Sequence, residues 1–272
     1  MRHGPGRYLD RLSWPEAELA LRRFRPALLP VGARTKEHGL HLPLATDWVQ
    51  AEYLCRRLVA ALPVLALPTL PYGYYPAFSD YPGSVSVRLE ACRDTVIDIC
   101  RSLAGHGAER TYVLNTGISS NWALEPARLQ LLEIGVLMDY TDLRRIELGA
   151  AAALIEQSAG SHADEVETSR MLYIAPGLVR QERARPELCE GGRGGPLTRD
   201  PRRHDAQFSA TGAFGDPTLA NAEKGRQLTE ALLAQLKAEI EALAEPHYRP
   251  PPPRVEYLRA PGTALTSTGQ SD

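Results

Sequence analysis

The sequence contains few cysteines and no long apolar run. Its four cysteines, Cys55, Cys92, Cys100 and Cys189, form no Cys-x-x-Cys pair, so we expect free thiols in a reducing cytoplasm rather than disulfides or a cysteine-bound metal. No stretch approaches the roughly 18 apolar residues that a membrane-spanning helix requires. The first ten residues are not followed by the apolar segment of a secretory signal. We therefore expect a cytoplasmic protein with no membrane partner.

An excess of charge of one sign is also absent. The 272 residues carry a formal net charge of −2, which gives no basic field for nucleic acid. Apolar residues make up 43% and charged residues 24% of the chain, as is usual for a globular protein with a sizeable core. The length allows one large domain or two small ones, and the sequence contains no internal repeat.

Short buried strands and amphipathic helices alternate along the first half of the chain. This alternation predicts an α/β protein with a mostly parallel sheet that is covered on both faces. In such sheets the ligand lies outside the carboxyl ends of the strands. The spacing predicts strands over 26–32, 63–70, 109–117 and 136–143, and helices over 46–62, 88–107 and 126–135.

The second half has weaker patterns. Residues 147–176 predict two helical pieces that separate near Gly160, with Ser161 as the N-cap of the second. Residues 181–216 are Gly- and Arg-rich and predict a lid, an interface arm or disorder. A final helix is expected over 222–243, and the Pro-rich tail over 246–272 is expected to be extended and disordered.

The stretch "KEHGLHLPLATD" brings together His38, His41 and Asp47 just after the first predicted strand. Imidazole nitrogens and carboxylate oxygens are the usual ligands of zinc, manganese or ferrous iron. Alternatively, the two histidines bond backbone carbonyls and Asp47 caps the following helix. The residues alone favour neither interpretation.

The stretch "LPVGARTKEHGLHLPLATDWVQAEYL" resembles a pattern of the creatininase family (creatinine amidohydrolase and relatives), which runs Pro-Val-Gly-x-x-Glu-x-His-Gly-x-His-Leu-Pro and then reaches an aspartate. Four further segments resemble family motifs in the same order: "YPGSVSV", "RSLAGHGAERTYVLNTG", "HADEVETSRML" and "GAFGDPTLANAEKG". The resemblance covers about residues 8–244 and is specific because the motifs occur together.

The resemblance implies one three-layer α/β/α domain over residues 1–245, assembled into a homo-oligomer, often a hexamer. It also implies hydrolysis of a C–N amide bond with two divalent ions at the carboxyl edge of the sheet. By position, His38 matches a metal-binding histidine and Asp47 the bridging carboxylate. His162 matches the histidine that acts as acid and base, and Glu167 matches an acid on the same helix.

The chain departs from the family pattern at two places. Lys36 stands where the family has a metal-binding glutamate, although Glu37 could serve after a shift of one residue. The turn 115–121, "NTGISSN", lacks the second metal-binding histidine of the family's Asn-Gly-His. Lys36 could replace the charge of a missing cation and hold Asp47 ionised, so that the protein binds one ion or none. The alternative is that Lys36 faces solvent.

These patterns predict an amidohydrolase that acts on a small cyclic or linear amide through water activated by zinc, manganese or iron, with one or two ions per subunit. Turn amides near Gly117 and Ser119 would stabilise the oxyanion, and His162 would protonate the leaving nitrogen. We place His41 and Tyr81 among the substrate-binding residues as well. Two alternatives stay open, namely a ligand-binding or assembly protein that has lost the chemistry, and a peptide-cleaving relative whose arm over 181–204 serves a larger substrate.

Overall fold

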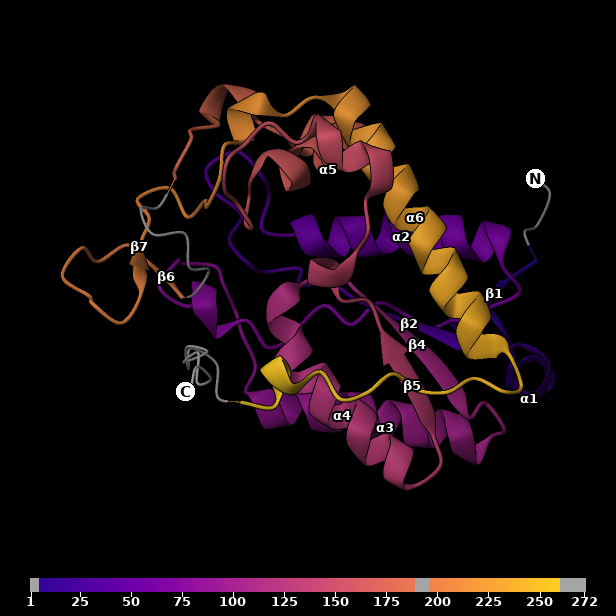
Figure 1. The fold of residues 1–272 in the computed structure, drawn as a ribbon. Helices are drawn as coiled ribbons and strands as arrows, with labels where there is room; N and C mark the ends of the chain where they lie inside the picture. The colour runs from indigo at the N-terminus through magenta and orange to yellow at the C-terminus, as the bar shows by residue number, and fades with distance from the viewer. Residues whose placement is uncertain (1–4, 189–195, 260–272) are drawn as a thin grey trace, which may run out of the picture.

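Five short strands form a parallel sheet at the centre of the computed structural model (Figure 1). The structure describes residues 5–188 and 196–259. Across the sheet the order is β1 (Arg7–Tyr8), β3 (Leu65–Ala66), β2 (Ala27–Val31), β4 (Arg110–Asn115) and β5 (Leu137–Tyr140), and all neighbours pair in parallel. The predicted parallel sheet is confirmed. However, β3 is shorter than the predicted strand over 63–70, because the prolines at both of its ends cannot donate to the ladder.

Helices cover both faces of this sheet. In Figure 1, α2 (Thr46–Ala61) and α6 (Ala222–Ala244) lie on one side, while α3 (Leu89–Gly105) and α4 (Asn121–Glu133) lie on the other. Side chains alternate along β2, so that Leu28 packs with α2 and α6 and Leu29 packs with α3 and α4. Helix α1 (Trp14–Arg23) packs near the amino ends of the strands. The three-layer α/β/α architecture is confirmed.

The second helical piece begins later than expected. Helix α5 covers Glu165–Ile174, and its N-cap is Asp164, whose Oδ1 accepts a hydrogen bond from the backbone N–H of Glu167 at 2.9 Å. Ser161 is not the cap, because the backbone of residues 161 and 162 bonds to Phe214 instead. The piece before it is only a 3-10 helix over Gly149–Leu154. His162 is therefore presented from an extended segment just before α5.

The chain after α6 is more ordered than the sequence predicts. Residues 246–259 run back along the side of β5 and α4 (Figure 1) and end in a 3-10 turn over Val255–Tyr257. The backbone N–H of Arg254 donates to Glu125 at 2.9 Å, and the hydroxyl of Tyr257 donates to Asp142 at 2.9 Å. These buried polar bonds fix the segment despite its prolines, so the expected disorder is wrong for 246–259, while residues 260–272 lie outside the described part.

The Gly- and Arg-rich segment is described only in part. Residues 189–195, which include Cys189, lie outside the described residues. After them, β6 (Leu197–Thr198) pairs in parallel with β7 (Gln207–Phe208), and the pair projects from the end of the molecule (Figure 1). Within the described residues, no helix is both long and apolar enough to cross a membrane.

Candidate active site

The site lies where β2 and β4 end and α2 begins. At Gly32 a β-carbon would stand 2.6 Å from the backbone oxygen of Asp47, so only glycine permits this approach. The hydroxyl of Thr116, just after β4, donates to the same oxygen at 2.8 Å. The first turn of α2 is therefore fixed against the carboxyl edge of the sheet, as expected for a parallel α/β protein.

Asp47 is buried between two basic side chains. Its Oδ2 lies 2.7 Å from Nζ of Lys36, and its Oδ1 lies 3.0 Å from Nε2 of His38. Burial alone would raise the pKa of Asp47, but Lys36 and His38 outweigh it and hold that pKa well below its usual range. Lys36 is 5% exposed, so the alternative of a solvent-facing lysine is wrong. Asp47 thus carries an ion pair and is not the helix cap.

His38 has both ring nitrogens opposite oxygen atoms. Its Nδ1 lies 2.8 Å from the carbonyl oxygen of Lys36, while its Nε2 faces Asp47 and stands 3.6 Å from Oε1 of Glu167. Burial and Lys36 would lower the pKa of His38, yet the two carboxylates outweigh them and raise it. The protonated ring donates from Nδ1 to the carbonyl and from Nε2 to Asp47. Once the Nε2 hydrogen is lost, the lone pair of this nitrogen is directed at two carboxylates. This is how metal-binding histidines are commonly oriented.

Glu37 is turned towards His162, 125 residues further along the chain. Oε1 of Glu37 lies 2.5 Å from Nε2 of His162, and its Oε2 accepts the backbone N–H of Gly39 at 3.1 Å. Gly212 leaves room for this carboxylate, since a β-carbon at that position would overlap Oε2. The ring of His162 lies 4.2 Å from that of Phe78 and 5.0 Å from that of His38, measured between centroids.

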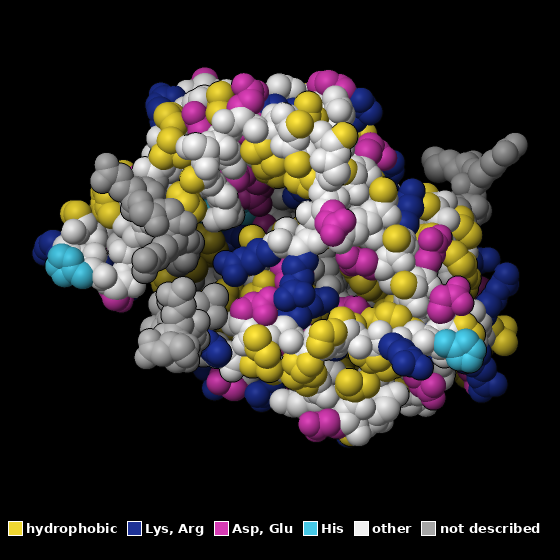
Figure 2. All heavy atoms as spheres, viewed as in Figure 1, with side chains coloured by type: hydrophobic (Ala, Val, Ile, Leu, Met, Phe, Trp, Pro, Cys, Tyr) yellow, Lys and Arg dark blue, Asp and Glu magenta, His cyan; other side chains and the backbone are white. Residues whose placement is uncertain are grey.

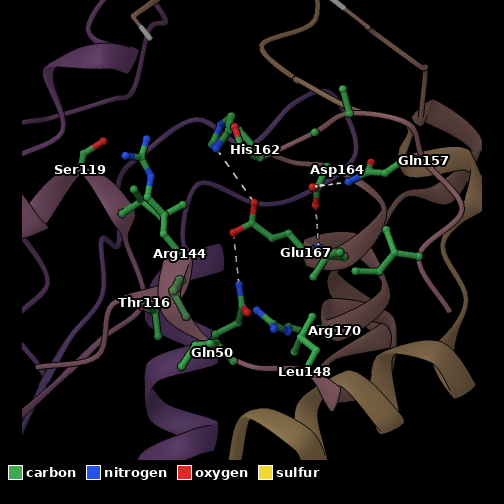
Figure 3. Close-up of a pocket in the computed structure, with 18 of the residues that line it drawn as sticks. Gln50, Thr116, Ser119, Arg144, Leu148, Gln157, His162, Asp164, Glu167 and Arg170 are labelled. Carbon is green, nitrogen blue, oxygen red and sulfur yellow. Dashed lines mark hydrogen bonds and ion pairs between the residues drawn. The ribbon is translucent and has the colours of Figure 1, made fainter. Parts of the chain in front are cut away.

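Glu167 completes the group from the first turn of α5. Its Oε2 accepts the backbone N–H of Ala163 at 2.9 Å, and its Oε1 accepts from Gln50 at 3.3 Å (Figure 3). Burial would raise the pKa of Glu167, but His38, His162 and Lys36 together outweigh burial and lower it. The structure therefore brings together all five residues that the sequence singles out for metal binding and proton transfer, namely Glu37, His38, Asp47, His162 and Glu167.

The donor set suits one divalent ion. His38, His162 and Glu167 offer ligand atoms that all lie within 4.8 Å of one another. Bonds of about 2.0–2.2 Å to zinc place ligand atoms at most about 4.4 Å apart, so small side-chain movements would close the set. On the other side of Asp47, the ammonium of Lys36 lies 2.7 Å from Oδ2, so a positive charge already occupies that side of the carboxylate.

The remaining predicted residues lie around this centre. Ser119 lines a cavity of about 470 Å³ that opens beside the charged centre, and Gly117 borders a small void beside Lys36. His41 bonds the hydroxyl of Thr168 at 2.7 Å, and burial lowers its pKa to about 4. The hydroxyl of Tyr81 donates to the carbonyl of Ser209 at 2.8 Å. Neither His41 nor Tyr81 is among the residues that line the cavity in the described part of the chain.

The cavity of about 470 Å³ opens beside the charged centre. Figure 2 shows the face of the molecule hollowed near its middle, with dark blue and magenta side chains at the edge. The polar side chains that line it and that sequence reasoning missed include Gln50, Arg144 and Arg170. Two of them could have been found from helical spacing, because Gln50 follows Asp47 by three residues and Arg170 follows Glu167 by three.

The fold is that of three-layer α/β proteins, in which ligands commonly bind at the carboxyl edge of the parallel sheet, and the candidate site lies at this edge. Residues 10–240 match the family model Creatininase, described as creatinine amidohydrolase, and the chain belongs to this family. Its family relatives are hydrolases.

Two relatives and one solved structure illustrate the similarity. The chain is 29% identical over 225 residues to a mycofactocin precursor peptide peptidase of Mycobacterium tuberculosis, covering 76% of this chain and 80% of the relative. It is also 29% identical over 195 residues to a creatinine amidohydrolase of Pseudomonas putida, covering 65% and 75%. A structure described as "Creatininase Mn" aligns with a TM-score of 0.74 at 23% identity, over 88% of this chain and 99% of that one. At this identity the structural likeness shows the fold alone.

Proposed function

We propose that the protein is a metal-dependent amidohydrolase that cleaves the C–N bond of a small cyclic or linear amide with one divalent ion per subunit. The observation that carries the proposal is the orientation of His38, whose Nε2 faces Asp47 and Glu167 beside a cavity. Zinc, manganese and iron all suit imidazole and carboxylate ligands. The Mn named for a similar structure supports a metal in this fold.

His38 and Glu167 would hold the ion, with Oδ1 of Asp47, 3.0 Å from Nε2 of His38, as a further oxygen. A nitrogen of His162 also lies within 4.8 Å of the ligand atoms of His38 and Glu167, but this ring is held by Glu37 and is assigned to proton transfer. When bound, such an ion polarises the amide carbonyl and lowers the pKa of a bound water towards neutrality. Lys36 keeps Asp47 ionised, as its 2.7 Å ion pair requires. Lys36 also supplies a fixed positive charge next to the turn 115–121, where the family pattern has a metal-binding histidine and this chain has none.

The pair of Glu37 and His162 would move the proton. Nε2 of His162 lies 2.5 Å from Oε1 of Glu37, so the ring is held in one orientation with its Nδ1 towards Glu167, 4.0 Å from Oε2. In the tautomer whose Nε2–H donates to Glu37, the lone pair of Nδ1 is available. This nitrogen can take a proton from water and deliver it to the leaving nitrogen of the amide. Glu37 therefore orients His162 in this scheme, instead of binding the metal as the sequence suggested.

The test combines metal content with amide hydrolysis in four proteins. We expect about one equivalent of metal in the wild type, and loss of both metal and activity after chelation. His38→Ala should lose the metal. His162→Gln should keep the metal and lose about 10²- to 10⁴-fold in rate, the range of general acid–base catalysis. His106→Gln, at the exposed end of α3 on the opposite edge of the sheet, is the matched control.

Three results would contradict the proposal. Two full equivalents of metal in the wild type would exclude a single ion. Loss of metal in His162→Gln would make His162 a ligand instead of the proton carrier. A metal-free wild type whose melting temperature does not respond to zinc, manganese or chelator would favour a ligand-binding protein without hydrolytic chemistry, because a ligand that binds only the native state raises its stability.

Peptide cleavage is the second candidate function. It is favoured by the 29% identity over 225 residues to the mycofactocin precursor peptide peptidase of Mycobacterium tuberculosis. The hydrolysis assay should therefore include short peptides next to small amides. If the peptides are cleaved faster than the small amides, the peptidase function is favoured, and the same residues would keep the same roles.

A further inference from the structure

The cavity contains a buried arginine that makes no hydrogen bond or ion pair within the described part of the chain. Arg170 lies on α5, three residues after Glu167, and is 8% exposed. Its guanidinium forms no hydrogen bond or ion pair with any residue in the ranges 5–188 and 196–259, and its Nε is fully buried without an acceptor. Figure 3 shows Arg170 among the residues that line the cavity, with its guanidinium end directed towards Gln50. A buried cation without a partner is unusual, because desolvation is unfavourable for it.

The carboxylates near Arg170 are already engaged elsewhere. Asp164 accepts from the backbone N–H of Glu167 at 2.9 Å and from Nε2 of Gln157 at 2.7 Å. Glu167 accepts from Ala163 and Gln50 and faces His38. Burial lowers the pKa of Arg170 even though Asp164 and Glu167 act to raise it. The nearby acids therefore leave the donors of Arg170 available.

A second arginine adds to the positive charge of the cavity. Arg144 is exposed and lines the same cavity. Its guanidinium lies 5.7 Å from the centre of the Trp122 ring. Among the described residues, its side chain makes no ion pair with a carboxylate. The cavity thus presents two arginines with unused donors, whereas its acids are bonded or belong to the candidate metal centre. Its volume of about 470 Å³ is within the usual range for small-molecule sites.

We propose that Arg170 is a specificity-determining residue that binds a carboxylate of the substrate, with Arg144 contributing at the cavity mouth. This inference rests on the proposed amidohydrolase function and names its substrate class as amides that also carry a carboxylate. The planar guanidinium matches a carboxylate in a two-pronged contact. Residues three apart on a helix have β-carbons about 5–6 Å apart, so this carboxylate lies only a few bonds from the amide that reaches Glu167 and His162.

The test compares two probes of nearly equal size. Succinamate carries one amide and one carboxylate, whereas succinamide carries two amides and no charge. Binding is measured by calorimetry and hydrolysis by ammonia release, in the metal-loaded protein. We expect wild type to bind succinamate about 10- to 100-fold more tightly, as charge-assisted hydrogen bonds imply. Arg170→Gln should abolish this preference, and Arg170→Lys should keep part of it because the charge remains without the fork.

The control is Arg101→Gln, an exposed arginine on α3 that should keep the full preference. Arg144→Gln should lose a smaller part of the preference for succinamate. Because Arg144 is exposed, this variant should fold and can be tested even if Arg170→Gln does not fold. Equal binding of both probes by the wild type overturns the inference. So does a preference that survives in Arg170→Gln, since the carboxylate would then be bound by the metal.

Inorganic phosphate serves as a third probe in the same calorimetric series. Tighter binding of phosphate than of succinamate would assign the arginines to a phosphate group and overturn the carboxylate class. Because binding is measured without turnover, the outcome is independent of the reaction. If neither amide releases ammonia while the preference for succinamate depends on Arg170, then the proposed hydrolysis fails for these amides and the anion site stands.

Discussion

Two lysines in this protein are equally buried but differ in their partners. Lys36 and Lys224 are each 5% exposed. Nζ of Lys224 bonds Glu165, Oε1 of Glu156 at 2.8 Å and the carbonyl of Leu219 at 3.0 Å, so its three hydrogens all have acceptors. Nζ of Lys36 has the single carboxylate of Asp47 at 2.7 Å, and lies 4.9 Å from the centre of the Phe78 ring.

This difference separates a structural lysine from one that acts on a site. Lys224 joins α6 to the segment before α5, and although burial would lower its pKa, Glu156 and Glu165 outweigh burial and raise it. Lys36 lines the cavity, and the carboxylate of Asp47 that it contacts also contacts His38. A buried ammonium with one acceptor and an open side acts mainly through its charge. We therefore expect Lys224 to determine stability and Lys36 to determine what the site binds.

The largest effect is expected from Lys224→Met. Removing this lysine leaves Glu165 buried without a cation, and breaking a buried ion pair in this way costs about 3–5 kcal/mol of the free energy of unfolding. Lys36→Met should cost less, about 1–3 kcal/mol, because His38 still donates to Asp47. Urea unfolding at pH 7 measures both. Equal losses in the two variants would contradict the distinction between the two lysines.

The next effect concerns metal affinity in Lys36→Met. The ammonium repels any cation that approaches Asp47, and two like charges about 5 Å apart interact by about 3 kcal/mol at an effective dielectric constant of 20. Removing the ammonium should therefore raise the affinity for zinc at least tenfold, measured by calorimetry. Lys237→Met, at a partly buried position on α6, is the matched control. Unchanged or weaker zinc binding would show that Lys36 does not compete with a cation.

The sequence predicts the frame of this site well. Alternating strands and helices place the ends of β2 and β4 at one edge, and residues of ligand type follow β2 directly. The match of the "HADEVETSRML" segment to a family motif adds His162 and Glu167, which the structure brings beside His38. Local pattern suffices here because a parallel sheet has only one carboxyl edge.

The partners within the site are not readable from local pattern. The turn of Glu37 towards His162 depends on the space left at Gly212, a residue 175 positions later in the chain. Whether the ammonium of Lys36 is solvated or buried depends on the direction of its side chain, which is set by the shape of its loop. The packing of residues 246–259 likewise depends on Glu125 and Asp142, which lie far earlier in the sequence. Such contacts are tertiary, so propensity and spacing carry no information about them.

The smallest effect is the acid dependence of the Lys36–Asp47 pair. Lys36 and His38 outweigh burial and lower the pKa of Asp47 in the folded protein, whereas an aspartate in the unfolded chain has a pKa of about 3.9. The ion pair therefore adds stability that is fully present above about pH 4 and is lost as the pH falls further towards the folded pKa, because the unfolded chain takes up the proton first.

Without the lysine, the pKa of Asp47 is less depressed and this acid-side loss is smaller. The difference in unfolding free energy between wild type and Lys36→Met is compared from pH 5 downwards, because Lys36 also lowers the pKa of His38 and the titration of that ring changes the difference nearer neutral pH. The difference should shrink by about 1 kcal/mol per pH unit below pH 4. Urea unfolding at pH 5, 4 and 3 measures the difference. If this difference in unfolding free energy stays constant down to pH 3, then Lys36 does not stabilise the charged form of Asp47. The short distance between the two side chains would then contribute nothing to stability.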